Sequence, residues 1–500
     1  MSAPLEPRIG AQLYGLLPEV YRERDRTGDL AKYLDSCGEL LDRVYATLRQ
    51  RLDDHFPETC QEWLIPYFAE LLDVSLRSPE PQARRAEVAN AIAWRQRKGT
   101  AAVTEEIAQA VGAMEVELQE GWQRVARTAR VGEQLPAATM DLRRHSRAMR
   151  ANQPGLDTRS TRFPREAEPV LWFQANAGGV PCFPDSYEDR SVRIVDLRTP
   201  DWRRGHFHPK RLLTFVPLPD GFFPVSQRSF DWAEREQAKA DGLLEVREEI
   251  LTRADGTRVL QKIFHCPGAA AAPVRIRGVI ELDDAEPAGM ELAYRFEGFY
   301  LANTLRVKFG RLELERCAAF KVVVHAHDQK APVFTATDCL LRHVRVASGL
   351  AQFEYCTVLG KNICEAVQAI DSLFMFRLQR QVADATTPPS KVVCLRNVRL
   401  PQEFVDALSD EDRKHIQNYT TEVPVFFRFG FGAPGAGVLH PATPASIQAG
   451  AQDGGELGAY HHQHLSLRRE AVLDKLGEFL PFGMEAVLIP DARLSCVPPR

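Results

Sequence analysis

Six side chains in the second half of the chain are of the types that cleave glycosidic bonds. Enzymes that cut glycans use paired carboxylates, or a carboxylate beside a lysine or arginine, as acid, base or nucleophile. The two aspartates of the set fall at expected corners of the chain, where aspartate commonly stabilises a turn. We therefore favour a structural role for these residues over a catalytic one. The six candidates are Asp338, Arg342, His343, Glu354, Lys361 and Asp371.

A group of histidines near the C-terminus has the side chains that hold first-row transition metals. In an extended strand His462 and His464 would share one face, and His461 with Glu456 or His440 could complete a metal site. The sequence does not fix these positions relative to one another, and the surrounding segment is rich in glycine. Polar loop residues without a metal are the interpretation we favour, and metal binding by His461, His462 and His464 stays an open alternative.

The loop motifs of common catalytic and nucleotide-binding sites are missing from the sequence. The glycine-rich stretch GFGAPGAGVL lacks the order of a Walker loop, and no strand is followed by GxGxxG and a helix. The GxSxG turn of many hydrolases is also missing. We predict a protein without catalytic residues or a cofactor, and therefore not an enzyme.

Composition and charge indicate a globular protein of several domains. The 500 residues suggest about three domains of roughly 150 residues each. The net charge of −4 argues against nucleic acid or an anionic membrane as the main partner. We expect no membrane span and no signal peptide, because the chain has no apolar run of roughly 18 residues and no basic start before an apolar stretch. Ten scattered cysteines without CxxC spacing are typical of a reduced, cytoplasmic protein.

Residues 1–120 predict a helical domain, whose clearest helix runs from Asp29 to about Asp53. Apolar residues recur along it with the four- and three-residue spacing of a coiled-coil seam. A stripe of this kind needs another helix to cover it, either from a neighbouring subunit or from the same domain. The seam consists of Leu30, Leu34, Cys37, Leu41, Val44 and Leu48, and Leu52 continues the spacing.

An apolar segment and a turn between two helices complete the helical domain. The apolar segment, WLIPYFAELLDV, spans residues 63–74. A helix over about 81–97 should end at Gly99, which can adopt the left-handed backbone that closes many helices. Thr100 can then cap the short helix that follows. Lys98, Gly99 and Thr100 are therefore predicted to form a helix-to-helix turn.

The middle of the chain predicts an arm followed by β-structure. Residues 121–165 are rich in arginine and poorly periodic, and we interpret them as an arm or linker. Residues 166–290 alternate short β-like runs with proline and glycine turns, which indicates a β-rich part. The basic run in the arm could bind an acidic surface, although a solvated face is the more usual role of such runs. It contains Arg143, Arg144, Arg147 and Arg150.

Small residues recur in register within residues 291–400. The triplets at 338–340, 355–357 and 371–373 follow one another after 17 and 16 residues, and Cys317 and Cys394 extend the series by 22 on either side. Stacked coils need small side chains at tight corners. We predict a short β-solenoid of about four or five coils, with an ordinary β-sandwich as the alternative.

The fold expected for the whole chain is α+β and multidomain. Residues 401–500 contain helical, strand-like and glycine-rich stretches, and we interpret them as a mixed C-terminal segment. A helical N-terminal domain, a β-rich region with a short β-solenoid and this mixed segment would then follow one another along the chain.

The first part of the chain resembles the tail protein I family of contractile phages and related phage-tail-like injection systems. The resemblance rests on Leu16-Leu17-Pro18 before a long helix and on the apolar segment from Trp63 to Val74. It also rests on Arg84-Arg85 followed by the stretch from Trp94 to Thr100, whose helix-to-helix turn is the most specific piece. It covers roughly residues 10–115, and the long β-rich extension is similar only to the larger members of such systems.

The resemblance implies a structural role in a baseplate. Family members pair with a larger wedge subunit around the central spike, and the sixfold ring holds the sheath extended until triggering. We therefore expect a wedge component with other wedge subunits, the spike or hub and sheath-proximal baseplate proteins as partners. It would be made in the cytoplasm and then enter a particle. The alternatives are a glycan-binding or glycan-cleaving β-solenoid protein of a phage-like particle, and a module that tethers the particle to its target.

Overall fold

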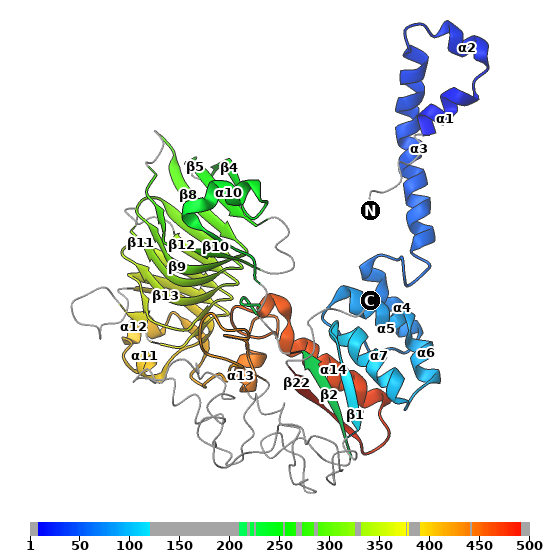
Figure 1. Ribbon diagram of the computed structural model, residues 1–500. Helices are drawn as coiled ribbons and strands as arrows, with labels where there is room; N and C mark the ends of the chain where they lie inside the picture. Colours follow the sequence, from blue (N-terminus) through cyan, green and yellow to red (C-terminus); the bar gives the residue numbers. More distant parts are fainter. Residues whose placement is uncertain are drawn as a thin grey trace, which may run out of the picture. The chain divides into compact units, whose positions relative to one another are not determined.

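The chain divides into two compact units, Met1–Val103 and Thr104–Arg500, of which the first is helical and the second is mainly built from strands (Figure 1). The predicted order of N-terminal helices and a following β-rich region is confirmed. The arm predicted over residues 121–165 and the part of the β-rich region over 166–209 lie outside the described residues. The computed structural model describes residues 9–120, 210–217, 221–224, 227–253, 256–266, 273–284, 289–325, 332–376, 378–379, 391–440 and 443–491.

The first unit contains a long helix and several short ones. The helix predicted from Asp29 to about Asp53 is present with those bounds as α3. The prediction of a single helix over 81–97 is wrong, because the helix is interrupted at Asn90. The Asn90 side chain donates to the Ala86 carbonyl at 3.0 Å and so competes with the helical hydrogen bonds. The other helices are α1 (Ile9–Leu16), α2 (Glu19–Arg24), η1 (Glu62–Leu64), α4 (Ile65–Leu71), α5 (Pro81–Ala89), α6 (Ala91–Gln96) and α7 (Ala101–Gly112), which continues into the second unit.

Two glycines let α1 and α3 cross with their backbones in contact. A Cβ atom on Gly38 would lie 2.3 Å from the Gly10 nitrogen, and one on Gly10 would lie 2.6 Å from the Asp35 Cα. The Ile9 amide also donates to the Asp42 carboxylate at 3.0 Å. Because glycine allows this close backbone approach, α1 lies against the first half of α3.

The second unit is built around two ladders of parallel strands. Most strands pair with a strand two or three places later along the chain. One ladder runs β5–β8–β10–β12–β14–β17–β20–β21, and the other runs β3–β6–β9–β11–β13–β15–β18–β20 (Figure 1). The chain thus alternates between the ladders, and we call each return to the same ladder a coil. Neighbours in an ordinary β-sandwich are antiparallel instead.

The bounds of these elements show that the ladders extend beyond residues 291–400 on both sides. The strands are β3 (Ser229–Asp231), β4 (Glu245–Thr252), β5 (Arg258–His265), β6 (Val274–Arg277), β7 (Ile280–Leu282), β8 (Glu291–Glu297), β9 (Phe299–Val307), β10 (Arg311–Glu315), β11 (Ala318–Val324), β12 (Pro332–Thr337), β13 (Leu340–Val346), β14 (Leu350–Glu354), β15 (Thr357–Val358), β16 (Asn362–Ile363), β17 (Ala366–Ile370), β18 (Leu373–Phe374), β19 (Leu378–Gln379), β20 (Lys391–Arg399) and β21 (Ile416–Thr420). The remaining elements of the unit are η5 (Trp232–Glu234), α10 (Arg235–Ala240), α11 (Gln402–Asp406), α12 (Asp410–Arg413), α13 (Ala445–Gln448), η6 (His461–Gln463), α14 (Leu465–Phe479), β1 (Glu117–Glu120), β2 (Arg211–Pro217) and β22 (Glu485–Asp491).

A continuous apolar core is shared by the successive coils. Because side chains alternate between the two faces of a strand, every second residue of a strand enters this core. Aromatic rings of successive coils contact one another inside it. The Phe264 and Phe296 centroids are 4.5 Å apart, and the Phe353 ring lies between Phe334 at 5.6 Å and Phe374 at 5.5 Å. The coils are therefore joined by packing as well as by hydrogen bonds.

Each of four successive coils turns a corner at a left-handed residue that precedes a small side chain. These corners contain the triplets that the sequence predicted to lie in register, and Cys317 is in register with them. The left-handed residues are Arg316, Asp338, Tyr355 and Asp371, with φ values of 48° to 51°, and the small residues after them are Cys317, Cys339, Cys356 and Ser372.

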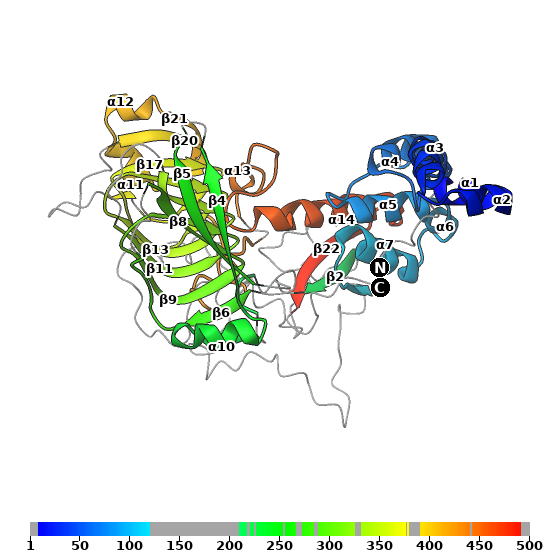
Figure 2. The same ribbon diagram turned by 90° about the horizontal axis from the view of Figure 1, so that it is seen from above.

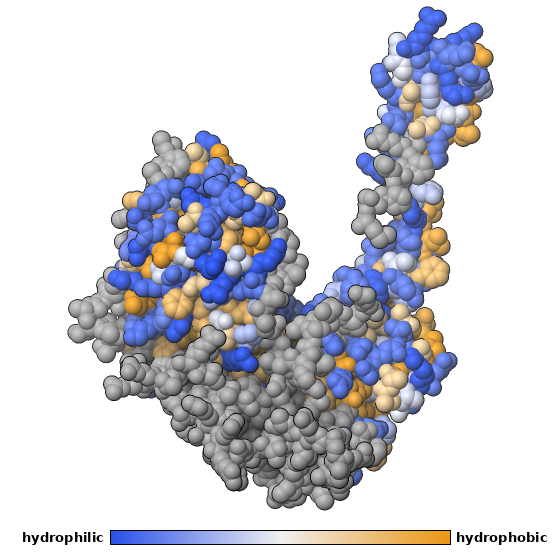
Figure 3. All heavy atoms as spheres, viewed as in Figure 1, coloured by the Kyte–Doolittle hydropathy of each residue, from blue (hydrophilic) through white to orange (hydrophobic). Residues whose placement is uncertain are grey.

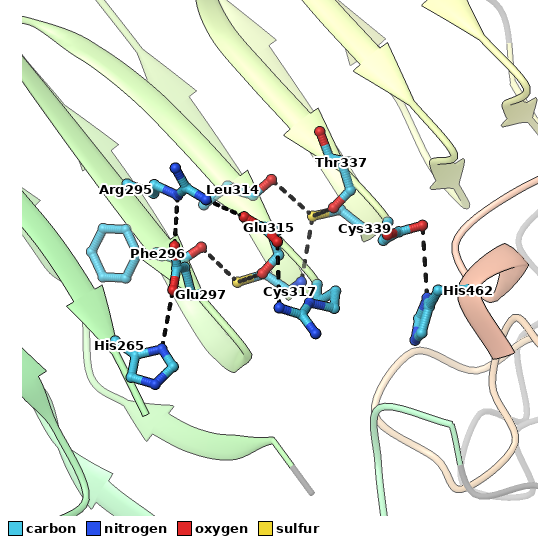
Figure 4. Close-up of polar contacts among 12 residues, drawn as sticks. His265, Arg295, Phe296, Glu297, Leu314, Glu315, Cys317, Thr337, Cys339 and His462 are labelled. Atoms are coloured by element: carbon cyan, nitrogen blue, oxygen red, sulfur yellow. Dashed lines mark hydrogen bonds and ion pairs between the residues drawn. The ribbon is translucent and has the colours of Figure 1, made fainter. Parts of the chain in front are cut away.

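The small side chains satisfy backbone groups at the corners (Figure 4). The Cys317 amide donates to the Cys339 sulfur at 3.4 Å, and the Cys317 thiol donates to the Phe296 carbonyl at 3.3 Å. Two coils later in the series, the Cys356 amide donates to the Ser372 hydroxyl at 3.0 Å. Burial raises the pKa of the Cys317 thiol to about 12, so this group stays protonated and can donate.

The predicted extension of this series to Cys394 is wrong. Cys394 lies inside β20 opposite Gln368. The next left-handed residue is Asn397, with a φ of 50°, and Val398 follows it. The equal spacing of Cys394 from the series is therefore a numerical coincidence, because the last coil is longer than the ones before it.

Short helices close both ends of the core (Figure 2). At the end near the first strands, Trp232 of η5 and Ala238 of α10 are buried in it. At the other end, Phe404 of α11 and Leu408 are buried in it. Such caps cover the apolar interior that the terminal coils would otherwise expose.

Residues 421–440 and 443–464 form a covering segment on the outer face of the coils. Arg399 joins this segment to the last coil, because it donates to the Glu422 carbonyl at 3.0 Å and to the Phe374 carbonyl at 2.7 Å. A second apolar cluster lies beneath the segment and contains Phe426, Phe427, Phe429, Leu457 and Tyr460 together with Tyr300, Ala318, Leu340 and Leu373 of the coils. The first residues of β9, β11, β13 and β18 are therefore buried on both faces of the ladder.

A small separate sheet brings together strands that are far apart in sequence. β1 pairs antiparallel with β2, and β2 pairs parallel with β22. The helix α14 lies beside this sheet (Figure 2). A Cβ atom on Gly112, the last residue of α7, would lie 2.9 Å from Val472 of α14, so this glycine permits close packing of the two helices.

Replacing Phe353 by alanine should lower the free energy of unfolding of the second unit by about 3–5 kcal/mol. The ring is fully buried between two others, so its removal leaves a cavity that the parallel strands are too constrained to fill. Chemical denaturation followed by circular dichroism measures the change. Phe482→Ala is the matched control, because this ring is fully exposed and should change the value by less than about 0.5 kcal/mol. Equal effects of the two substitutions would contradict the packing described.

Candidate functional site

The seam predicted on the long helix is half covered and half exposed. Leu30, Leu34 and Cys37 are half-buried, on the part of α3 that α1 crosses. Leu41, Val44 and Leu48 are 44%, 56% and 59% exposed. The second half of the seam therefore has no covering partner within the residues of this unit that the structure describes.

Further apolar side chains widen the exposed half of the seam. On an α-helix with 100° between residues they all fall within an arc of about 140°. Figure 3 shows the corresponding hydrophobic surface along one side of the long helix. We call this surface the apolar stripe, and it consists of Leu40, Leu41, Val44, Tyr45, Leu48 and Leu52, each at least 44% exposed.

Sequence reasoning missed Leu40 and Tyr45 because they lie outside the heptad spacing. Each is adjacent to a seam residue on the helix surface, so a search for an apolar arc rather than for a seam would have found them. Burying one such side chain contributes about 1.5–3 kcal/mol. A stripe of six can therefore stabilise a complex considerably, even after the cost of association.

Two arginines of the first unit hold its short helices together through backbone carbonyls. Arg85 donates to the Cys60 carbonyl at 2.7 Å and also to the Pro57 carbonyl. Arg95 donates to the Leu72 carbonyl at 2.6 Å. The Arg84-Arg85 pair was identified from the sequence by resemblance alone, and at Arg85 the structure gives it a physical task, which is to fix α5 against the loop that follows α3.

The turn at residues 98–100 has the geometry of a helix stop followed by a helix start. Gly99 has a φ of 87°, a conformation that glycine adopts without strain. The Thr100 hydroxyl donates to the Arg97 carbonyl at 3.0 Å and accepts from the Val103 amide at 3.4 Å, which caps α7. Lys98 is exposed. The turn therefore positions helices and leaves one cation on the surface.

The two aspartates considered as glycan-cleaving residues contact the covering segment. Asp371 is buried, and its carboxylate accepts from the Gln452 amide at 3.0 Å. Asp338 Oδ1 lies 3.7 Å from His462 Nδ1. Both occupy the left-handed corner position. Their observed contacts therefore match the turn role that we favoured, with the added function of holding the covering segment.

Of the other candidates in that set, Arg342 and His343 lie on β13, and Lys361 lies between β15 and β16. The Arg342 guanidinium stacks over the Phe320 ring at 5.0 Å. The His343 Nδ1 accepts from the Lys361 amide at 3.2 Å. Burial, together with the positive charge of Arg342, lowers the pKa of His343, so its neutral form is favoured. Glu354 is half-buried at the end of β14.

The histidines near the C-terminus are arranged differently from the expected strand. Residues 461–463 form the 3-10 helix η6, which has three residues per turn, so His461 and His464 come to the same side. The expectation that His462 and His464 share a face is therefore wrong, and His462 Nδ1 lies near Asp338 instead. His440 lies against the Phe427 ring at 4.9 Å.

Asp453 is the residue near these histidines that sequence reasoning missed. Its Oδ2 lies 2.9 Å from His461 Nε2, and one donor atom each of Asp453, His461 and His464 lie within 4.8 Å of one another. Glu456, the carboxylate considered from the sequence, contributes its backbone carbonyl to His461 Nδ1 at 2.9 Å. Burial raises the pKa of the Glu456 carboxyl to about 7.

A segment of this chain is similar to a known family of phage proteins. Residues 27–154 match the family model described as Phage tail protein (Tail_P2_I), which confirms the predicted resemblance to the tail protein I family. The match covers about a quarter of the chain and contains α3 and the turn at residues 98–100. No curated protein and no solved structure matches the chain. Among the described residues no helix is long and apolar enough to cross a membrane.

Replacing Gly99 by alanine should lower the free energy of unfolding of the first unit by about 1–2 kcal/mol, the cost of a left-handed conformation in an L-residue. Differential scanning calorimetry measures the effect, with the unfolding transition of the helical unit resolved from that of the second unit. Gly477→Ala provides a control of opposite sign. Gly477 lies inside α14 with open space around a Cβ, so alanine there should stabilise by about 0.5–1 kcal/mol. Stabilisation by Gly99→Ala would contradict the described turn.

Proposed function

We propose that this protein, which has a phage tail protein segment over residues 27–154, is a structural component of the baseplate wedge of a contractile, phage-tail-like injection system. The family supports a structural role in an assembled particle, without catalysis. The observation that carries the finer proposal is the apolar stripe of α3, which lies inside the matched range.

The apolar stripe supports a helix of a neighbouring wedge subunit as its partner. Its residues repeat with helical spacing along the second half of α3, and a stripe of this kind pairs with another amphipathic helix. The polar residues that flank it, such as Arg43 and Glu39, are exposed. We infer that α3 and a helix of the larger wedge subunit form a bundle, whereas α1 already occupies the first half of α3.

The parallel ladders support the interpretation of the coils as a β-solenoid. Their shared core and capped ends make this part a stiff body, which in a wedge would hold neighbouring parts at a fixed distance. We propose the organisation predicted from the sequence: a helical baseplate domain over 1–120, an arm over 121–165, β-rich and solenoid parts over 166–290 and 291–400, and a mixed segment over 401–500. The coils of the solenoid part continue beyond 291–400 on both sides, through β5 and β6 before it and β21 after it.

The proposed wedge surrounds a central spike or hub with sixfold symmetry and contacts the sheath-proximal baseplate proteins. Through these contacts it holds the sheath in its extended state. The protein is made in the cytoplasm, enters the particle during assembly and binds no nucleic acid. The net charge of −4 supports the absence of a nucleic-acid partner.

Replacing Leu41, Val44 and Leu48 by glutamine should prevent incorporation into particles without unfolding the chain. All three are exposed, so the isolated chain should lose less than about 0.5 kcal/mol of stability per site. The interface would lose at least about 1.5 kcal/mol per side chain, which in sum weakens it by more than about 100-fold. Quantitative mass spectrometry of purified particles from the producing cell measures the amount of this chain relative to the sheath protein.

The matched control is the double substitution Glu39→Gln and Arg43→Gln, which changes exposed polar residues of the same helix. It should leave incorporation unchanged. Electron microscopy of the particles supplies the second measurement, because loss of a wedge subunit should leave free sheath or tube without a baseplate. Normal baseplates that contain the triple variant would overturn the proposed role of the apolar stripe.

A further inference from the structure

Three potential metal ligands converge where the covering segment meets the start of α14. One donor atom each from Asp453, His461 and His464 lie within 4.8 Å of one another. Asp453 is exposed, His461 is buried and His464 is half-buried. Asp453 comes from a loop, and His461 and His464 come from η6 and its C-cap, which directly precedes α14, so an ion bound there would join the loop to the turn before α14.

The surroundings of His461 leave one ring nitrogen directed at a carboxylate. Its Nδ1 lies 2.9 Å from the Glu456 carbonyl and its Nε2 lies 2.9 Å from Asp453 Oδ2. A neutral imidazole donates through one nitrogen only. When Nδ1 carries the proton and donates to the carbonyl, the Nε2 lone pair faces the carboxylate oxygen. Two acceptors that face each other in this way repel, unless a cation or a second proton lies between them. A carbonyl that orients a histidine in this way is the usual support of a metal ligand.

The ring of His461 is also held rigidly. It stacks on the Tyr355 ring with a centroid distance of 4.1 Å and an interplanar angle of 17°. A Cβ atom on Gly455 would lie 2.8 Å from its Cε1, so the absence of a side chain at Gly455 lets the loop pass beside the ring. A metal ligand that is already held by packing and by a second hydrogen bond loses little conformational freedom when an ion binds.

We propose that Asp453, His461 and His464 bind one divalent transition metal ion of the zinc class. Two imidazoles and one carboxylate suit such an ion, whereas calcium and magnesium prefer sites built from oxygen atoms alone. The fourth position would hold water, which can reach the ion beside the exposed Asp453. The ion would fasten the covering segment to α14 at a corner of the coils, and this role does not depend on the proposed place in a baseplate.

The test is a titration of the untagged full-length protein with Co²⁺ after treatment with a chelator. Wild type should bind one equivalent with visible absorption of low-symmetry Co²⁺, Zn²⁺ should displace it, and either ion should raise the melting temperature. Asp453→Asn and His464→Asn should each weaken binding by more than about 100-fold, because loss of a ligand exceeds the 10- to 100-fold effect of losing a supporting group. Asparagine is chosen at position 464 because it tolerates the φ of 48° found there.

His462→Asn is the matched control, because this neighbouring histidine faces Asp338 and lies outside the proposed site. It should bind Co²⁺ as wild type does. Circular dichroism without metal should be the same for all variants, which separates loss of a ligand from loss of the fold. Absence of Co²⁺ binding by wild type, or binding that survives both asparagine substitutions, would overturn the proposal and leave His461 as an imidazolium paired with Asp453.

Discussion

Hydrogen bonds between corresponding strands of successive coils are the interaction on which the second unit depends. In a parallel ladder each inner strand uses its backbone groups on both sides, so a coil is stable only beside the coils before and after it. The corners are the places where the ladder hydrogen bonds are interrupted, because the chain must change direction there within one or two residues. A left-handed residue makes the turn, and the thiol or hydroxyl that follows it bonds the backbone groups of the adjacent coil.

The first unit depends on the packing of helices instead. In α3, a helix of 25 residues, Gly38 is the one buried residue, and it is buried because α1 crosses there. Most of the stability of helices in proteins comes from packing of an apolar face, and over the second half of α3 that face is exposed. The same chain therefore combines coils that share a closed apolar core with a helix whose apolar side is exposed.

The sequence made some of these features predictable and hid others for physical reasons. The spacing of leucines located α3, and the triplets around Cys339, Cys356 and Ser372 located the corners, because both patterns follow directly from backbone periodicity. The position of Cys394 could not be read in the same way, since the length of a coil depends on its loops. Asp453 escaped notice because the bonds that hold it beside His461 are set by a folded loop rather than by any repeat.

The backbone geometry of the corners is constant from coil to coil, whereas the length of the chain between corners varies. The left-handed residues at 316, 338, 355 and 371 have φ values within a few degrees of one another, although the chain between them ranges from 16 to 22 residues. Differences in length are thus absorbed by the loops, while strand register is reset at every corner. Insertions between corners should be tolerated both in evolution and in design, and a foreign peptide grafted there could be displayed without disturbing the interior.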